Sequence, residues 1–285
     1  GATTISAGTL QIGGGGTTGT LGTGATTNDG KLVFDRSNAL TVSSAISGTG
    51  TVSQAGTGTT SLTGANSYSG TTTISAGILS VGAGSTVGTL GDGSVTNNGT
   101  LQINRSNAIT IANDISGTGA LTKLAAGTAT LTGANSYSGT TTITTGILEV
   151  GAGGAAGTLG TGGVVNNATL RFNRSDDIAV SNAISGTGAL SKVGSNELTL
   201  TGANTYSGVT TISAGTLQVG AGGTTGSLGT GGVVTTGGTL TFNRSDAMTV
   251  ANVISGTGAV MQVGAGTTSL TGANTYSGPT TISAG

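Results

Sequence analysis

The feature that most constrains the fold of this chain is an internal repeat of close to 69 residues. The phrase LTGANSYSGTTTISAG begins at Leu62 and returns, slightly varied, from Leu131, Leu200 and Leu270. The only four tyrosines of the chain follow the same period, with successive spacings of 69, 69 and 70 residues. A fixed period of this kind predicts an array in which each unit buries its faces against its neighbours.

The period divides the chain into four full units and the start of a fifth. The units are residues 1–69, 70–138, 139–207 and 208–277, followed by a partial unit at 278–285. The extra residue of the fourth unit lies where VVNNATLRF becomes VVTTGGTLTF, in a Gly-containing turn between apolar runs. Because a turn absorbs such an insertion without changing the register of its strands, we expect one continuous solenoid over residues 1–285.

Each unit further divides into thirds of 21–24 residues that carry short Val-, Ile-, Leu- and Thr-rich runs. Apolar and polar residues alternate in these runs, as at Leu79 and Val81, whereas no helical period is sustained. Gly, Asn and Ser separate the runs and are typical of tight corners. This pattern predicts an all-β fold, a parallel β-solenoid with about three coils, or rungs, per 69-residue unit. A β-propeller fits less well, because its blades are antiparallel and it closes on itself.

One set of residues conflicts with simple alternation along the strands. Strict alternation places these long polar side chains inside, two residues after an apolar inward position: Gln54, Lys123, Lys192 and Gln262. We expect the strand to end or bulge there so that the side chain turns outward.

Composition argues against several classes of function. Charged residues make up only 6% of the chain and the net charge is -1, so no basic surface favours nucleic acid or an anionic membrane. Cys, His and Trp are absent, which excludes disulfides and the common Cys and His metal sites. No apolar run is long enough for a membrane-spanning helix, and the first residues do not have the pattern of a signal peptide.

The acidic residues do not suggest an active site. The nine carboxylates are scattered along the chain and mostly do not recur between units: Asp29, Asp35, Asp92, Asp114, Glu149, Asp176, Asp177, Glu197 and Asp246. Adjacent residues on a strand point to opposite faces, so Asp176 and Asp177 are a poor catalytic pair. One Asp, at Asp92, resembles part of a calcium β-roll, but its equivalents lack the carboxylate. We therefore expect no enzyme activity, no cofactor and no metal.

Two residue types recur once per unit and are the candidates for surface or lateral contacts. They are Arg36, Arg105, Arg174 and Arg244, and Tyr68, Tyr137, Tyr206 and Tyr276. The arginines fit a row that contacts a neighbouring molecule or a polyanion, or exposed corners that pair locally with residues such as Asp176 or Asp246. The tyrosines fit either an exposed aromatic line or rings packed against the corner beside the Asn of the same phrase.

The phrase LTGANTYSG.TTISAGTLQVG, preceded by ISGTGALTK.G, resembles the autotransporter-associated β-strand repeat of large bacterial surface proteins. The match covers every unit. The resemblance implies a right-handed β-helix in an exported passenger region, outside a Gram-negative-type outer membrane, with a translocator barrel elsewhere in a longer protein. It supplies no catalytic residues.

Together these features favour a non-catalytic, extracellular rod or stalk segment of an autotransporter-like adhesin or surface fibre. An alternative is a filament or matrix protein that assembles through end-to-end and lateral association with itself. A third is a solenoid that binds host-surface or matrix glycans, or ice, through outward Thr, Asn and Tyr, although TTTI recurs too rarely for a regular Thr ladder.

Overall fold

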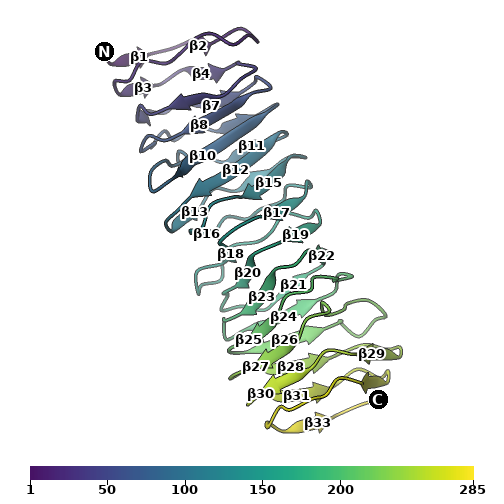
Figure 1. Cartoon of the computed structure of the whole chain (residues 1–285). Coiled ribbons are helices and arrows are strands. Elements are labelled where there is room, and N and C mark those ends of the chain that lie inside the picture. The colour runs from purple at the N-terminus through teal and green to yellow at the C-terminus, as the bar shows by residue number, and fades with distance from the viewer. The chain divides into compact units, whose positions relative to one another are not determined.

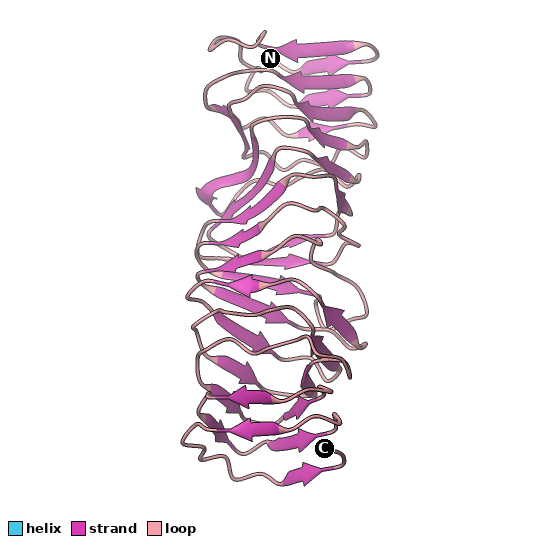
Figure 2. Cartoon of the chain, turned by 90° about the vertical axis from the view of Figure 1, so that its right-hand side faces the viewer, coloured by secondary structure: helices cyan, strands magenta, loops and turns pink.

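The computed structural model describes residues 1–285 as two compact units, each of which is a stack of parallel β-strands. The first unit comprises Gly1–Gly146 with Thr158–Gly160, and the second comprises Ile147–Gly157 with Thr161–Gly285. Strands and loops account for the whole chain and no helix is present (Figure 2). The predicted parallel β-solenoid is confirmed, whereas its continuity over residues 1–285 stays a prediction.

In the first unit, strands from successive coils stack in parallel to form long ladders (Figure 1). One sheet contains β1 (Thr3–Ile5), β3 (Thr26–Asn28) and β6 (Ile46–Ser47). A second contains β2 (Thr9–Ile12), β4 (Lys31–Phe34), β7 (Thr51–Gln54), β9 (Thr72–Ile74), β11 (Val95–Asn97) and β14 (Ile115–Ser116). A third contains β5 (Leu40–Val42), β8 (Thr59–Leu62), β10 (Ile78–Ser85), β12 (Thr100–Arg105), β15 (Ala120–Lys123) and β17 (Thr141–Ile143). A further pair is β13 (Ile109–Ile111) with β16 (Thr128–Leu131).

The second unit is built in the same way. One ladder contains β18 (Ile147–Val150), β20 (Thr169–Phe172), β23 (Ala189–Lys192), β25 (Thr210–Ile212), β27 (Val233–Thr235) and β30 (Ile254–Gly256). Another contains β21 (Ile178–Val180), β24 (Glu197–Leu200), β26 (Thr216–Val219), β28 (Thr239–Phe242), β31 (Ala259–Gln262) and β33 (Thr280–Ile282). The remaining pairs are β19 (Val164–Asn166) with β22 (Ile184–Ser185), and β29 (Met248–Val250) with β32 (Thr268–Leu270).

The 69-residue repeat is not a whole number of coils. Register partners in successive coils are 19 to 23 residues apart, as in Thr59↔Ile78 and Thr3↔Thr26. From β2, three such steps lead through β4 and β7 to β9 in the same sheet. The repeat equivalent of β2 is β10, which lies one side further round, in the sheet of β8 and β12.

The expected three coils per unit is therefore an approximation: each repeat completes three coils and one additional side. In the second unit the equivalent strands β18 and β26 likewise belong to different sheets. Within each unit, features that recur once per repeat consequently lie on different sides of the stack and do not form one straight row.

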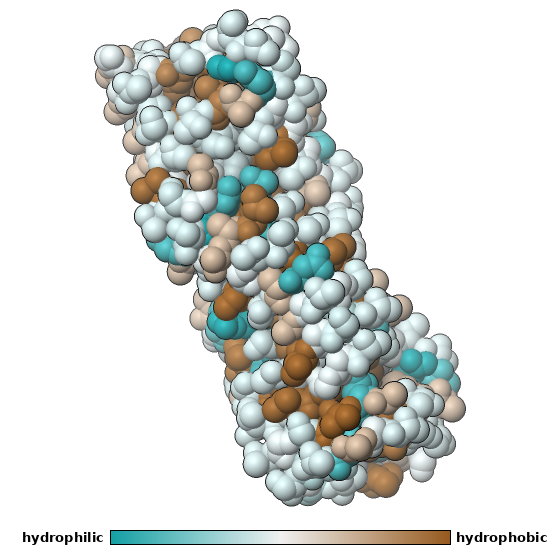
Figure 3. Space-filling view, viewed as in Figure 1, coloured by the Kyte–Doolittle hydropathy of each residue, from teal (hydrophilic) through white to brown (hydrophobic).

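The interior is filled by aliphatic side chains stacked in register, as the alternation predicts. Leu79, Leu101 and Leu121 lie directly above one another in the first unit, and each is fully buried. Such columns place the same side-chain type at the same height of every coil, which suits dense packing along a narrow core. The face shown in Figure 3 consists largely of residues of intermediate hydropathy, with scattered hydrophobic and hydrophilic side chains.

Candidate functional site

The tyrosine that recurs once per unit lies inside the solenoid. Tyr68, Tyr137 and Tyr206 have no exposed surface, and each hydroxyl is 2.7–2.8 Å from the Oγ1 of a threonine four residues later: Thr72, Thr141 and Thr210. Burial raises the pKa of all three phenols. Tyr276 makes the same bond to Thr280 but keeps partial exposure.

Each buried ring is covered by a glycine of the next coil. A Cβ built on Gly91 lies 2.5 and 2.6 Å from ring carbons of Tyr68, and Gly229 stands in the same relation to Tyr206. Only a glycine fits at such a distance. Three of the four tyrosines therefore pack in the interior, where they have no surface for the contact role expected of them.

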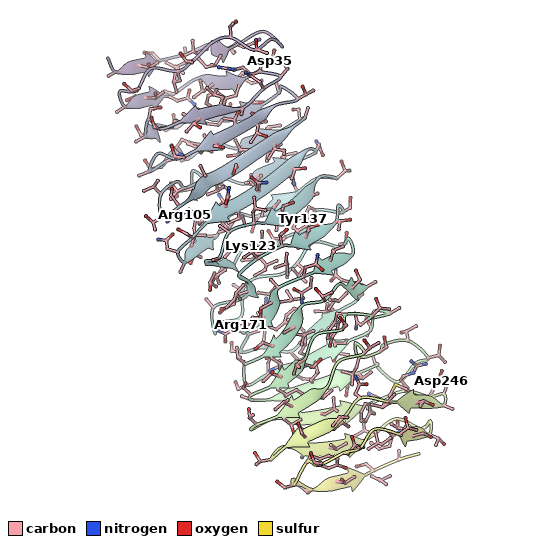
Figure 4. All side chains as sticks on the ribbon, in the orientation of Figure 1. Asp35, Arg105, Lys123, Tyr137, Arg171 and Asp246 are labelled. Carbon is pink, nitrogen blue, oxygen red and sulfur yellow. The ribbon has the colours of Figure 1, made fainter.

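The recurring arginine is also mostly buried, and it ties a loop of its own solenoid. Arg105 is 7% exposed and donates to the carbonyl oxygens of Gly88 and, at 2.6 Å, Thr86 in the preceding coil. Its Nε and Nη2 also donate to Asn107 Oδ1 at 3.0 and 2.8 Å. Arg105, Lys123 and Tyr137, which are labelled in Figure 4, all lie in the first unit.

The other three arginines repeat this arrangement. Arg36 donates to Gly19 and Thr17, Arg174 to Gly157 and Ala155, and Arg244 to Gly226. In the second unit the partner two residues later is a carboxylate, so the predicted local pairing with Asp176 and Asp246 is confirmed, at 2.6 Å in each case. These bonds from arginine lower the pKa of both carboxyls.

The expectation of an exposed corner is corrected by these bonds. The arginine fork bonds to backbone oxygens of the preceding coil, and it loses most of its own exposure in doing so. An arginine held in this way presents little charge to a partner, and the two recurring arginines of each unit lie on different sides of that unit.

The prediction that the long polar side chains turn outward is wrong for three of the four. Each strand does end at this residue, as expected, since Gln54, Lys123 and Lys192 are the last residues of β7, β15 and β23. Their side chains are nevertheless fully buried, while Gln262 is partly exposed. Lys123 pairs in register with Ile103 and Ile143, so its aliphatic stem extends a buried column. Its Nζ donates to the carbonyl oxygens of Ala125 and, at 3.2 Å, Thr145.

The side chain stays inside because the corner that follows its strand supplies acceptors. Gln54 Nε2 donates to Gly56 O at 2.7 Å and Gly58 O at 3.2 Å, and Gln262 bonds equivalent glycines. Burial lowers the pKa of Lys192 to about 8, against a weaker opposing effect of Asp177, and lowers that of Lys123 as well. The interior thus holds two ammonium groups whose hydrogen-bond partners are backbone carbonyls.

The acidic side chains remain dispersed. No group of three or more Asp or Glu residues converges. Glu149 on β18 contacts the following coil, with Arg171 on β20 at 3.1 Å and Asn173 just after β20 at 2.9 Å. Gln11 and Asp35 occupy the positions of Glu149 and Asn173 in the first repeat and are also hydrogen-bonded. The contact between coils is thus kept, while the residue types that make it differ between repeats.

Two shallow grooves lie at equivalent positions of the second and fourth repeats, and the sequence did not predict them. One lies between the segment 89–92 and strand β13 and has a volume of about 260 Å³. The other lies at the equivalent place in the fourth repeat, between 227–230 and β29, with a volume of about 430 Å³. We call them the β13 groove and the β29 groove. Both have a floor of leucine and other aliphatic side chains and a rim of hydroxyl and amide groups.

Comparison with known proteins identifies the repeat. The family model described as passenger-associated-transport-repeat matches residues 1–12, 52–81, 121–150, 190–219 and 262–285, in phase with the 69-residue period. The chain is built of autotransporter passenger repeats. The matched stretches hold the buried tyrosine and the lysine or glutamine of the interior, so the family pattern coincides with residues that the scaffold uses.

A curated relative gives the same assignment. The passenger repeats are 46% identical over 56 residues to the adhesin BmaC autotransporter of Brucella suis biovar 1 (strain 1330). The alignment covers 20% of this chain and 2% of the relative. No solved structure matches the chain. The chain contains no helix that is long and apolar enough to cross a membrane.

Proposed function

We propose that this chain is a stalk segment in the passenger of an autotransporter-type adhesin, displayed outside the outer membrane, and that it is structural and not catalytic. The proposal rests on one observation: the polar side chains that recur in each repeat form hydrogen bonds within the solenoid itself. Arginine and asparagine of each repeat bond to the chain's own neighbouring coils, and the tyrosine hydroxyl bonds to a threonine four residues later. Their recurrence is thereby explained by the scaffold without a ligand.

The asparagine of the repeated phrase illustrates this use. Asn66 Oδ1 accepts from the N–H of Ile46 at 2.9 Å, and its Nδ2 donates to Thr89 O at 2.7 Å. One side chain thus bridges the coil before and the coil after it. Asn135 and Asn204 make the equivalent bonds. Bonds of this kind satisfy the backbone where strands are interrupted and keep the coils stacked.

The mechanism of a stalk is mechanical. Every coil is held to the next by parallel ladder bonds and by a stacked aliphatic interior, so local extension must break several bonds together. A stalk in a passenger would hold a binding region away from the cell, and its low charge avoids self-repulsion.

A repeat exchange in the full-length protein on the bacterial surface tests this function. Residues 139–207 are replaced by a second copy of residues 70–138, which has the same length and preserves the register. A stalk predicts unchanged surface display, measured by protease accessibility on intact cells, and unchanged attachment. Loss of attachment with display intact would contradict a purely structural role.

Association with itself, end to end or laterally, is a second proposal. It is favoured by strands that stand at the end of their sheets, such as β13 and β29, because sheet-edge strands carry unpaired backbone groups. Electron microscopy of the purified chain distinguishes the two proposals, since association predicts continuous or bundled fibres at high concentration. Binding of host-surface or matrix glycans through outward Thr and Asn is a third proposal, and a glycan array tests it.

A further inference from the structure

Each repeat starts a new sheet, and the strand that starts it has one free edge. β13 is the first strand of its sheet and pairs only with β16, while its equivalent β29 pairs only with β32. The backbone of Ile111 faces the next coil, where its carbonyl accepts from the N–H of Thr132 at 3.0 Å. Val250 accepts from Thr271 in the same way at 2.9 Å.

Residues alternate in direction along a strand, so the backbone groups of Thr110 and Thr249 point to the preceding coil. The preceding coil has no strand there. It contributes the irregular segments 89–92 and 227–230, and neither segment bonds to the backbone of Thr110 or Thr249. An edge of this kind is a template for an added strand.

Side chains hold the two layers together on either side of this gap. At one end Arg105 bonds to the carbonyl of Gly88, and at the other Asn113 Nδ2 donates to Gly91 O at 2.8 Å and Gly93 O at 2.6 Å. In the fourth repeat Arg244 and Asn252 make the corresponding bonds, to Gly226 and to Gly229 and Gly231. Between these ties lie the β13 and β29 grooves.

The lining of the grooves defines the chemistry of an occupant. The residues common to both are a hydroxyl residue, Leu, Gly, two aliphatic floor positions, Thr, Ala and Asn. Phe242, in the β29 groove, is the one aromatic residue among the residues that line the two grooves. The charges are not shared, since Asp92 lines one groove and Arg244 the other. Five consecutive residues line each groove along the free edge, 109–113 and 248–252, so an extended segment of about five residues matches this length.

We propose that the β13 and β29 grooves dock an extended, uncharged polypeptide segment with small side chains, which bonds to the free backbone groups of Thr110 and Thr249. This goes beyond the stalk role, because it gives the scaffold a lateral docking position in each unit. The backbone pairing supplies affinity, and the shallow apolar floor selects against bulky or charged residues.

The test uses the full 285-residue chain and a synthetic peptide of sequence GTATLTG. This is the sequence of residues 127–133, which already pairs along the other edge of β13 with Thr130 opposite Thr110. Fluorescence anisotropy of the labelled peptide measures binding, and a peptide with Glu at alternate positions is the comparison. We expect saturable binding of the uncharged peptide only.

Groove-filling variants locate the site. Ala112→Trp combined with Ala251→Trp places a bulky side chain in both grooves from exposed positions. Its matched control is Ala83→Trp with Ala152→Trp, two exposed positions outside the grooves. We expect about a tenfold loss of affinity in the first pair and no change in the second. Unchanged circular dichroism shows that both variants fold.

A second readout does not depend on any variant. Hydrogen exchange of the Thr110 and Thr249 amides should slow when the peptide is added, while the amide of Thr122, inside the sheet on β15, should not change. Absence of saturable binding, equal loss in both Trp pairs, or unchanged exchange at Thr110 and Thr249 would overturn the proposal. Oligosaccharide binding that the groove-filling pair abolishes, without peptide binding, would replace the occupant by a glycan.

Discussion

The contact between Gly91 and Tyr68 provides the sharpest test of the packing between coils. In Gly91→Ala the new methyl would meet ring carbons of Tyr68 at 2.5 and 2.6 Å, and the Tyr68 carbonyl oxygen closer still. Neither neighbour is free to move. The ring is fully buried with its hydroxyl bonded to Thr72, and the carbonyl accepts from the N–H of Asp92 at 2.8 Å. Overpacking in a dense interior costs 1–3 kcal/mol, and the rigid backbone contact places this substitution near the upper end, at about 3 kcal/mol.

Because the stability of a repeat array is a sum of local terms, the loss should be local. Hydrogen exchange with mass spectrometry should show residues 62–95 opening about a hundredfold more readily, which is the fold-change for roughly 3 kcal/mol. The matched control is Gly16→Ala, whose Cβ meets nothing within 4 Å, with an expected change within about 0.5 kcal/mol. If Gly91→Ala exchanged like the wild type, the buried position of Tyr68 would be refuted.

The remaining predictions concern the other buried polar groups. Arg105→Lys keeps the charge but loses the fork that holds Gly88, Thr86 and Asn107, so chemical denaturation should show a loss of about 2 kcal/mol. Because the pKa of Lys192 is about 8 when folded and near 10.4 when unfolded, the unfolded chain binds more protons between these values. Stability should therefore rise as the pH increases from about 8 toward 10, measured as urea midpoints, and should change less in Lys192→Gln, which copies Gln54 of the first repeat. A flat wild-type profile over that window would contradict the burial of the ammonium group. Tyr137→Phe removes the bond to Thr141 and should cost about 1 kcal/mol by thermal denaturation, against no measurable change for Tyr276→Phe, where the hydroxyl pair is exposed.

The repeat, the strand content and the stacked aliphatic interior were all predictable from the sequence. The repeat period and the alternation of apolar and polar residues can be read directly from the order of residue types. The alternation places Leu79 and Leu101 inside, where the structure pairs them. The family resemblance rested on the same phrase and was confirmed by the family model.

The number of sides per repeat was not predictable, because it depends on where the chain lacks a strand. The segments 63–71 and 86–93 occupy positions in the stack without forming strands, and their length alone does not show how far round they travel. A division into equal thirds treats every coil alike and misses the additional side.

The fate of Lys123 and Lys192 was predicted wrongly for an energetic reason. Sequence alternation places them inside, and the cost of burying an amine argued for a bulge. The corner that follows each strand, however, turns carbonyl oxygens toward the amine, which offsets that cost without a bulge. The acceptors belong to the fold and are not visible in the pattern of residue types. The grooves were missed likewise, since they arise where a strand is absent.

The parallel coils and their registers can be tested with engineered disulfides, because the chain has no cysteine of its own. Gln102 and Thr122 are register partners on the outward face of β12 and β15, at a strand spacing that suits a disulfide. We predict that Gln102→Cys with Thr122→Cys forms a disulfide in oxidising buffer. Gln102→Cys with Ala125→Cys, the spacing of three equal coils per repeat, should remain reduced. Closure of the second pair without the first would contradict the registers on which the buried tyrosine, the arginine ties and the grooves all depend.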